Sequence, residues 1–350
     1  MTSLNDIAKH LDLSPMTVSR VVNNVGNVSP ATRDRVLAAM RELGYKRDEY
    51  ASINAQKRGN RPALRHVIVD AAEEDPKARA RFAFFSNIAL SILHRLNRLE
   101  CRFTVTDLER STDEHLDALT SADAIIFCSP VSAATVETVR KMNRDIQGVA
   151  ICQHSCAGFT SVDPDDEAGG RLAAEAFAQA GYERVLTFGT EDQQSQALRL
   201  DSFTRNLQRL CPQVRIDHLR YGVKPDGVWT DSETAMLTPV ATYWRDHGAP
   251  EAIFIPGGYA TFLLYRFLRR QGIRIPGDIG LMGYDDLAFY DYLDDPLDRV
   301  VFDTSALAHH AVDALLPFLT KGIIPRGTSR ILVPASYTPR GSIRSLATLP

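Results

Sequence analysis

The sequence predicts a small all-α head followed by a two-lobed α/β core with parallel sheets. Two helix-start signals, Ser14-Pro15 and Ser29-Pro30, stand close together near the N-terminus. Beyond residue 64, short apolar runs alternate with helical patterns, which is typical of parallel sheets covered by helices on both faces. The 350 residues exceed one compact domain of about 100–200 residues, so a small module and two lobes fit the length.

Three short helices are expected in the head, residues 1–46. In 4–11 the apolar residues share one helical face. Ser14 as N-cap and Pro15 in the first turn predict a second helix that runs to about Asn23. The same signal at residue 29 predicts a third helix, which ends at Gly44. Helices this short need one another to bury a core, so we expect a helix-turn-helix unit.

A polar segment, 47–63, follows the head and is rich in Lys, Arg and Asn, which indicates a hinge or linker. The core is expected over 64–342, with a short tail, 343–350. Its strand candidates are 66–69, 102–106, 124–128, 148–152, 184–189, 252–256 and 279–283. In 85–96 the apolar residues keep i, i+3, i+4, i+7 spacing, which predicts a helix.

Composition and charge exclude several classes of protein. Apolar residues are 44% and charged residues 24%, as in ordinary globular proteins. No apolar run reaches the roughly 18 residues of a membrane span, and the N-terminus lacks a secretory pattern, so a cytoplasmic protein is expected. Five scattered Cys argue against a disulfide framework. Residues 1–60 hold nine Lys or Arg and six Asp or Glu although the whole chain has net charge −3, which suits a DNA-binding head on an acidic body.

The segment 14–24 has the residue types of a helix that reads the major groove. Arg20 can make a bidentate contact to guanine, and Met16 can contact a thymine methyl. Short polar side chains suit phosphates, which set the register. The candidate DNA-binding residues here are Pro15, Met16, Thr17, Ser19, Arg20 and Asn23. On residue types alone, an ordinary surface helix is an equal alternative.

The head also resembles a known family. The segments LNDIA (4–8), LSPMTVSRVVN (13–23), VSPATRDRV (28–36) and ELGY (42–45) are similar to the head of the LacI/GalR family of transcription regulators. The resemblance implies a homodimer that binds a near-palindromic operator, with one recognition helix in each half-site. After Ser342 too few residues remain for a tetramerising heptad helix.

The resemblance extends loosely over the core. The matching positions are Asp165-Asp166, Arg199, Gly283-Tyr284-Asp285-Asp286, Pro296-Leu297, Pro334 and Arg340-Gly341-Ser342. It implies a core similar to periplasmic sugar-binding proteins, with a small-molecule effector, a sugar, between two lobes.

Three positions depart from the family pattern. The hinge Leu that wedges into the minor groove is Asn54 here, beside Ile53, so either Ile53 inserts or the operator is bent less. An Asn-Asp pair after the strand at 252–256 is replaced by Gly257-Gly258, which is expected to leave space for a ligand larger than a monosaccharide, such as a disaccharide. A Gln near position 302 is Phe302.

A sugar site needs bidentate polar side chains and a flat aromatic platform. Arg199 matches the family's ligand-gripping Arg, and Asp285 lies at the carboxyl end of a strand, where ligands of open α/β sheets bind. The remaining candidates supply a further polar group and the aromatic walls: Gln153, Trp229, Phe84 and Phe85, with Phe82 as an alternative to the last two. As alternatives, Arg199 and Asp285 could pair across the lobes, and Trp229 could be a packing residue.

Other groups of residues give no evidence of a metal site or a catalytic site. Cys152, His154 and Cys156 would share one face of an extended strand, but their spacing fits no zinc signature, so no metal site is predicted. No catalytic or nucleotide-binding motif is present, so neither a catalytic residue nor a cofactor is predicted. An acidic cluster is expected to be a solvated loop: Asp291, Asp294, Asp295 and Asp298.

The favoured interpretation is a sequence-specific DNA-binding transcription regulator, a repressor, whose operator affinity is controlled by a sugar. The alternative is the solute-binding protein of a transporter, against which residues 1–45 and the missing export signal argue. An enzyme on the same scaffold is the third hypothesis, and the missing catalytic motifs argue against it.

Overall fold

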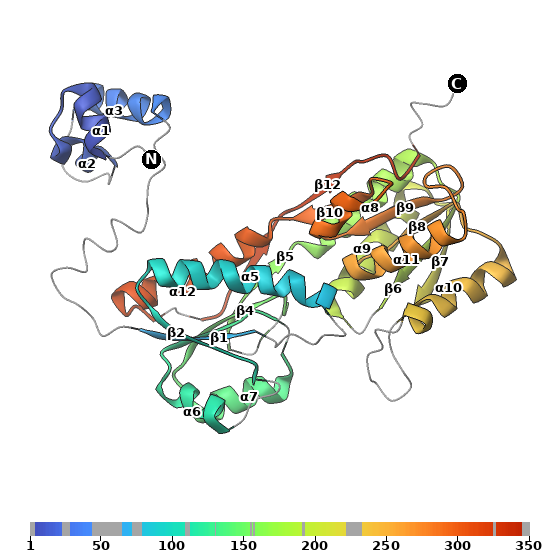
Figure 1. The fold of residues 1–350 in the computed structure, drawn as a ribbon, viewed down its shortest axis with the longest axis horizontal. Helices are drawn as coiled ribbons and strands as arrows, with labels where there is room; N and C mark the ends of the chain where they lie inside the picture. The colour runs from blue at the N-terminus through green and yellow to red at the C-terminus, as the bar shows by residue number, and fades with distance from the viewer. Residues whose placement is uncertain are drawn as a thin grey trace. The chain divides into compact units, whose positions relative to one another are not determined.

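The computed structural model describes residues 4–22, 29–43, 65–71, 79–108, 113–129, 131–154, 156, 158–190, 193–221, 233–324 and 327–344. The chain divides into an N-terminal head and a core that begins at Arg65. Figure 1 shows the three helices of the head and the two sheets of the core. Each unit is described by itself.

The head consists of α1 (Leu4–Leu11), α2 (Pro15–Val22) and α3 (Pro30–Glu42). The hydroxyl oxygens of Ser14 and Ser29 accept hydrogen bonds from the backbone N–H of Thr17 and Thr32, at 3.1 and 3.2 Å. Both predicted N-caps are therefore confirmed. The buried core of the head is Ile7, Ala8, Val18, Val21, Val36 and Ala39.

The first lobe is built on a six-stranded sheet in the order β11-β5-β4-β3-β1-β2. Its strands, all parallel, are β1 (His66–Asp70), β2 (Arg102–Thr106), β3 (Ala124–Phe127), β4 (Gln147–Ile151), β5 (Thr160–Pro164) and β11 (Arg330–Val333). One face is covered by α5 (Arg79–Arg98) and α12 (Thr304–Lys321), the other by α6 (Asp113–Ser121) and α7 (Ala133–Met142) (Figure 1).

The second lobe has the order β12-β10-β9-β8-β6-β7. Its strands are β6 (Arg184–Gly189), β7 (Arg215–Arg220), β8 (Ala252–Phe254), β9 (Gly280–Tyr284), β10 (Asp298–Phe302) and β12 (Ala335–Thr338), of which β12 alone of these six runs antiparallel to its neighbour. Phe254 packs on the side of α8 (Asp166–Ala180) and α9 (Gln194–Leu210). Ile253 packs with α10 (Glu233–His247) and α11 (Gly258–Arg270).

The chain passes between the lobes after β5, after β10 and again between β11 and β12. Each lobe is therefore assembled from segments far apart in the sequence. The residues that follow β4 in the first lobe and β9 in the second lie at the carboxyl ends of parallel strands, the edge at which ligands of open α/β sheets bind. This arrangement positions the site described below.

All seven expected strands are present, within two residues at each end. Five more were not expected: β5, β7, β10, β11 and β12. The expectation that Asp298 lies in a solvated loop is wrong. It begins β10, is 1% exposed, and its carboxylate accepts hydrogen bonds from the backbone N–H groups of Arg340 and Ile343 at 2.8 and 2.7 Å. Within the described residues, no helix is long and apolar enough to cross a membrane.

Candidate functional site

Arg199, on α9, is the centre of a buried polar cluster in the second lobe. Its Nε donates to Asp166 Oδ1 at 2.6 Å, and one terminal nitrogen donates to the carbonyl oxygen of Pro256 at 2.8 Å. The same nitrogen lies 3.4 Å from Asp285 Oδ1. The guanidinium carbon stands 3.7 Å from the centre of the Tyr284 ring, a cation–π distance. Arg199 is thus held tightly by one carboxylate and loosely by another.

Asp285 follows β9 and has a positive φ of 69°. Few non-glycine residues adopt this backbone conformation, and they concentrate at functional sites. Its Oδ2 accepts a hydrogen bond at 3.1 Å from the backbone N–H of Gly258, at the start of α11. Arg199 and Asp285 belong to the same lobe, so the alternative that they pair across the lobes is wrong. The neighbouring Asp286 points elsewhere and pairs with Arg299 at 2.8 Å.

The two carboxylates beside Arg199 differ in electrostatic character. Burial alone would raise the pKa of Asp166, but the charge of Arg199 and hydrogen bonds from His154 and Arg199 give it a net lowered pKa. Burial raises the pKa of Asp285, and Arg199 and the Gly258 N–H offset this only in part. Asp166 is therefore the firm counter-ion of Arg199, and Asp285 is the more loosely paired carboxylate.

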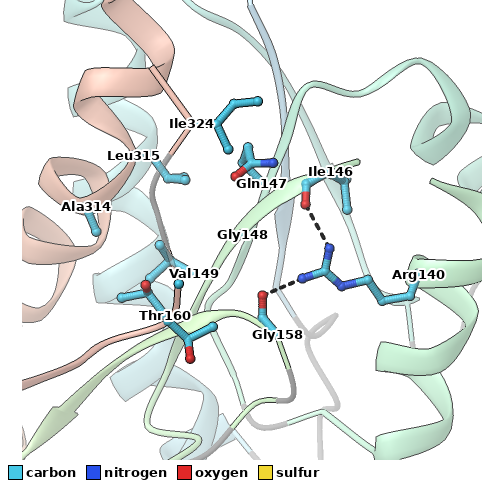
Figure 2. Close-up of a pocket in the computed structure, with 12 residues that line it drawn as sticks. Arg140, Ile146, Gln147, Gly148, Val149, Gly158, Thr160, Ala314, Leu315 and Ile324 are labelled. Atoms are coloured by element: carbon cyan, nitrogen blue, oxygen red, sulfur yellow. Dashed lines mark hydrogen bonds between the residues drawn. The ribbon is translucent and has the colours of Figure 1, made fainter. Parts of the chain in front are cut away.

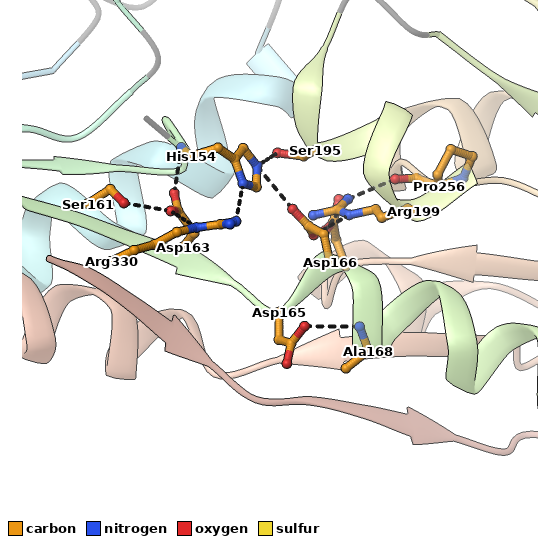
Figure 3. A network of polar contacts seen from close by, with 11 residues as sticks. His154, Ser161, Asp163, Asp165, Asp166, Ala168, Ser195, Arg199, Pro256 and Arg330 are labelled. Atoms are coloured by element: carbon orange, nitrogen blue, oxygen red, sulfur yellow. Dashed lines mark hydrogen bonds and ion pairs between the residues drawn. The ribbon is translucent and has the colours of Figure 1, made fainter. Parts of the chain in front are cut away.

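A second part of the cluster comes from the first lobe and was not predicted (Figure 3). His154, just after β4, places Nε2 2.9 Å from Ser195 Oγ and 3.1 Å from Asp166 Oδ2. Its Nδ1 lies 2.8 Å from a terminal nitrogen of Arg330. Arg330 Nε also donates to Asp163 Oδ2 at 3.1 Å. Ser195 stands one helical turn before Arg199, which was a usable sequence signal, whereas nothing in the sequence linked Arg330 to His154.

Aromatic side chains adjoin Arg199. Phe302 lies 5.9 Å from the guanidinium carbon and packs against Phe84 and Tyr284, with ring centres 5.9 and 6.3 Å apart. Phe84 in turn contacts Phe85 edge to face at 5.0 Å. Phe84 and Phe85 come from α5 in the first lobe and Phe302 from β10 in the second, so this aromatic wall spans both lobes.

The remaining predicted effector residues have other surroundings. The Gln153 amide makes two hydrogen bonds to the backbone of Val131, both 3.0 Å, so it braces a loop. Trp229 lies outside the described residues. The expectation that Gly257-Gly258 leaves open space is wrong. A Cβ on Gly257 would lie 3.0 Å from the Gln196 amide, and one on Gly258 would lie 2.5 Å from Leu287.

The head presents α2 as the candidate DNA-reading helix. Val18 and Val21 are buried, while Pro15 is exposed and Thr17 half-buried. The Thr17 hydroxyl lies 2.8 Å from that of Ser14, so it takes part in the cap. Met16, Ser19 and Arg20 are on α2, but their side chains lie outside the described part. The other three predicted DNA-binding residues, Asn23, Ile53 and Asn54, lie outside the described residues.

A cavity of about 260 Å³ lies in the first lobe, away from Arg199 (Figure 2). Val149 and Thr160 of the sheet, Leu315 of α12 and Arg140 of α7 line it. Arg140 donates to the backbone oxygens of Arg144, Ile146 and Gly158. None of the predicted effector residues lines this cavity, and among the described residues no group of His, Cys, Asp and Glu could hold a metal ion.

Residues 3–48 match the family described as bacterial regulatory proteins, lacI family, and residues 174–343 match the periplasmic binding protein-like domain. One chain thus contains a head that matches the lacI family and a segment that matches the periplasmic binding protein-like domain. The chain therefore carries a lacI-family head. The helices α1 to α3 lie within the lacI-family match, and the six strands of the second sheet lie within the match to the periplasmic binding protein-like domain.

Relatives of this chain match over most of their length. The sucrose operon repressor of Escherichia coli is 27% identical over 84% of this chain and 86% of the relative. The lactose operon repressor of Escherichia coli strain K12 is 26% identical over 97% and 89%. A solved complex of the transcriptional regulator CelR with cellobiose covers 98% of this chain and 100% of the other, with 22% identity and a TM-score of 0.64.

Proposed function

We propose that this protein represses transcription by binding an operator through α2, and that a sugar bound beside Arg199 and Asp285 controls the binding. One observation carries the proposal: a lacI-family head is joined to a core in which a buried Arg199 is held firmly by Asp166 and only loosely by Asp285. Sequence-specific DNA binding and a ligand-responsive core are then properties of the same chain.

Adjacent hydroxyls of a sugar fit between Arg199 and Asp285. One hydroxyl oxygen can accept from the guanidinium while another hydroxyl donates to the carboxylate, so each buried group keeps a partner when the 3.4 Å contact opens. The aromatic wall of Phe84 and Phe302 supplies an apolar face for the sugar ring. Contacts from both lobes would make the sugar bind one arrangement of the lobes more tightly, which is the requirement for control.

The proposed contacts to DNA are made by residues between positions 16 and 23. Arg20 reads a guanine, Met16 contacts a thymine methyl, and Thr17, Ser19 and Asn23 contact phosphates. The protein acts as a homodimer on a near-palindromic site. We infer a role in regulation and no enzymatic activity, since the relatives are named as repressors and regulators. A transporter's solute-binding protein would share the core, but it would have no use for the head.

A mobility-shift experiment tests the proposal. DNA from upstream of the protein's own gene and its neighbours is titrated with the full chain, alone and with sucrose, lactose or cellobiose, and with ribose as a smaller control sugar. The expected result is a specific shift that one of the disaccharides alters. Absence of specific binding to every fragment would remove the repressor assignment, and a shift indifferent to every sugar would remove the effector class.

A further inference from the structure

We propose that His154 is a positioning residue through which the first lobe holds Arg199 in its sugar-binding orientation. The proposal rests on the function proposed above for Arg199. His154 does not need to touch the sugar, because it acts through Asp166. Its side chain is 2% exposed, and its ring bridges the two lobes (Figure 3).

The hydrogen-bond partners of His154 fix its tautomer. The terminal nitrogen of Arg330 lies 2.8 Å from Nδ1, and a guanidinium can only donate. Nδ1 must therefore accept and carries no hydrogen. The single hydrogen of the neutral ring is then on Nε2, the nitrogen that faces the second lobe.

Nε2 makes a hydrogen bond with Ser195 Oγ at 2.9 Å, and it also lies 3.1 Å from Asp166 Oδ2, a buried oxygen that has no hydrogen-bond partner among the described residues. Asp166 accepts from Arg199 Nε through its other oxygen at 2.6 Å. The orientation of the buried Asp166 carboxylate is thus set from one side by His154 and from the other by Arg199. Without the His154 hydrogen, the carboxylate loses one of its two charged or polar anchors.

The two sides of the ring belong to different lobes. Arg330 is on β11 and is anchored by Asp163 of β5, whose other oxygen accepts from the His154 backbone N–H at 2.9 Å. Ser195 and Arg199 lie on α9 of the second lobe. Asp166 begins α8, which packs on the second sheet, so separation of the lobes takes both Ser195 and Asp166 away from His154 Nε2. The position of the lobes therefore decides how firmly Arg199 is held, and by reciprocity a ligand on Arg199 biases the lobes.

Side-chain NMR of the full chain, labelled with ¹⁵N at His and Arg, tests this assignment without any sugar. Long-range ¹H–¹⁵N spectra report the tautomer of each His, and His154→Leu identifies the His154 signal by its loss. The expected result is the Nε2–H tautomer in the wild type and a mixture of tautomers in Arg330→Met. The matched control is Arg171→Met, which removes the ion pair of Arg171 with Glu175. The exposed fractions of the two arginine side chains are nearly equal, 45% for Arg171 and 44% for Arg330.

A second readout follows the Nε–H resonance of Arg199. We expect it to be visible in the wild type and in His154→Gln, whose amide can still donate to Asp166, and to be lost in His154→Leu. Calorimetric titration with sucrose, lactose and cellobiose should rank the three proteins in the same way, with sugar affinity highest in the wild type, slightly lower in His154→Gln and lowest in His154→Leu. His154→Leu weakens binding about tenfold and His154→Gln less than about threefold.

Three results would overturn the assignment: an Nδ1–H tautomer in the wild type, equal spectra for Arg330→Met and Arg171→Met, or an Arg199 resonance unchanged in His154→Leu. A wild-type protein that binds none of the sugars would count against the proposed function instead. Both NMR readouts would still decide the role of His154.

Discussion

Arg199 has two roles, because it is both the proposed sugar contact and the counter-ion of the fully buried Asp166. Removing it leaves a charged carboxylate without its main partner. A substitution at this position therefore acts on stability as well as on ligand binding, and the two effects have to be separated.

Arg199→Ala should abolish the sugar response and lower the unfolding free energy by about 3–5 kcal/mol, the usual cost of breaking a buried pair. Asp285→Ala should also abolish the response with a smaller loss of stability, because the Asp285 carboxylate is loosely paired and its pKa is already raised. Calorimetry with the responsive sugar and heat denaturation measure the two effects. Normal sugar binding in both variants would contradict the site.

The lowered pKa of Asp166 predicts a pH dependence of stability. In the unfolded chain the carboxyl takes up its proton near its ordinary pKa of about 3.9, before the folded protein does. Its contribution is therefore present above that value and is lost as the pH falls through the lower folded pKa. Heat-denaturation midpoints of the wild type should drop more steeply below about pH 4 than those of Asp166→Asn. Parallel curves would show that Asp166 is not the titrating group.

Arg20→Ala should cost about 1–3 kcal/mol on the cognate operator and relax discrimination at one base pair. Thr17→Ala, at a proposed phosphate contact, should weaken operator and unrelated DNA about equally. Binding isotherms on an operator and on point variants of it separate these patterns. Unchanged operator affinity in Arg20→Ala would remove α2 as the reading helix.

At the scale of residues, the sequence identified the centre of the site but not its surroundings. Arg199 and Asp285 were predicted and do lie together, and Phe84 and Phe85 join the aromatic wall next to Arg199. His154 and Arg330 were not predicted because their contact joins residues 176 positions apart, which no local pattern encodes. The space beside Gly257 was misjudged because Gln196 fills it from another helix.

Among the elements, three of the strands that were not predicted have polar residues that interrupt or end an apolar run: β5, β7 and β10. β7 reads RIDHLR and lies at the edge of its sheet, so half of its residues face solvent. β5 ends in Asp-Pro, and β10 begins with Asp298, a residue type that disfavours strands. Tertiary contacts, above all those of Asp298 with the C-terminal segment, override that local preference.

The hinge predicted at 47–63 is an element whose function can be tested directly, although it lies outside the described residues. With Asn54 where a wedging Leu is expected, operator DNA should be bent less unless Ile53 inserts. Asn54→Leu should tighten operator binding and increase bending, as measured by circular-permutation gels or by energy transfer between the DNA ends. If neither quantity changes, the hinge works without a wedge.

The whole molecule is expected to be a dimer. The family resemblance implies that two copies pair through the core. Light scattering at micromolar concentration should give twice the mass of the 350-residue chain. A stable tetramer or a monomer under these conditions would contradict the prediction.

The division of the last strands between the lobes has a genetic consequence. β11 completes the edge of the first sheet and β12 that of the second, so residues 330–338 build both lobes at once. A nonsense mutation just before Arg330 removes an edge strand from both halves of the core. Alleles truncated at this point should therefore behave as complete losses of function and leave the target genes permanently expressed.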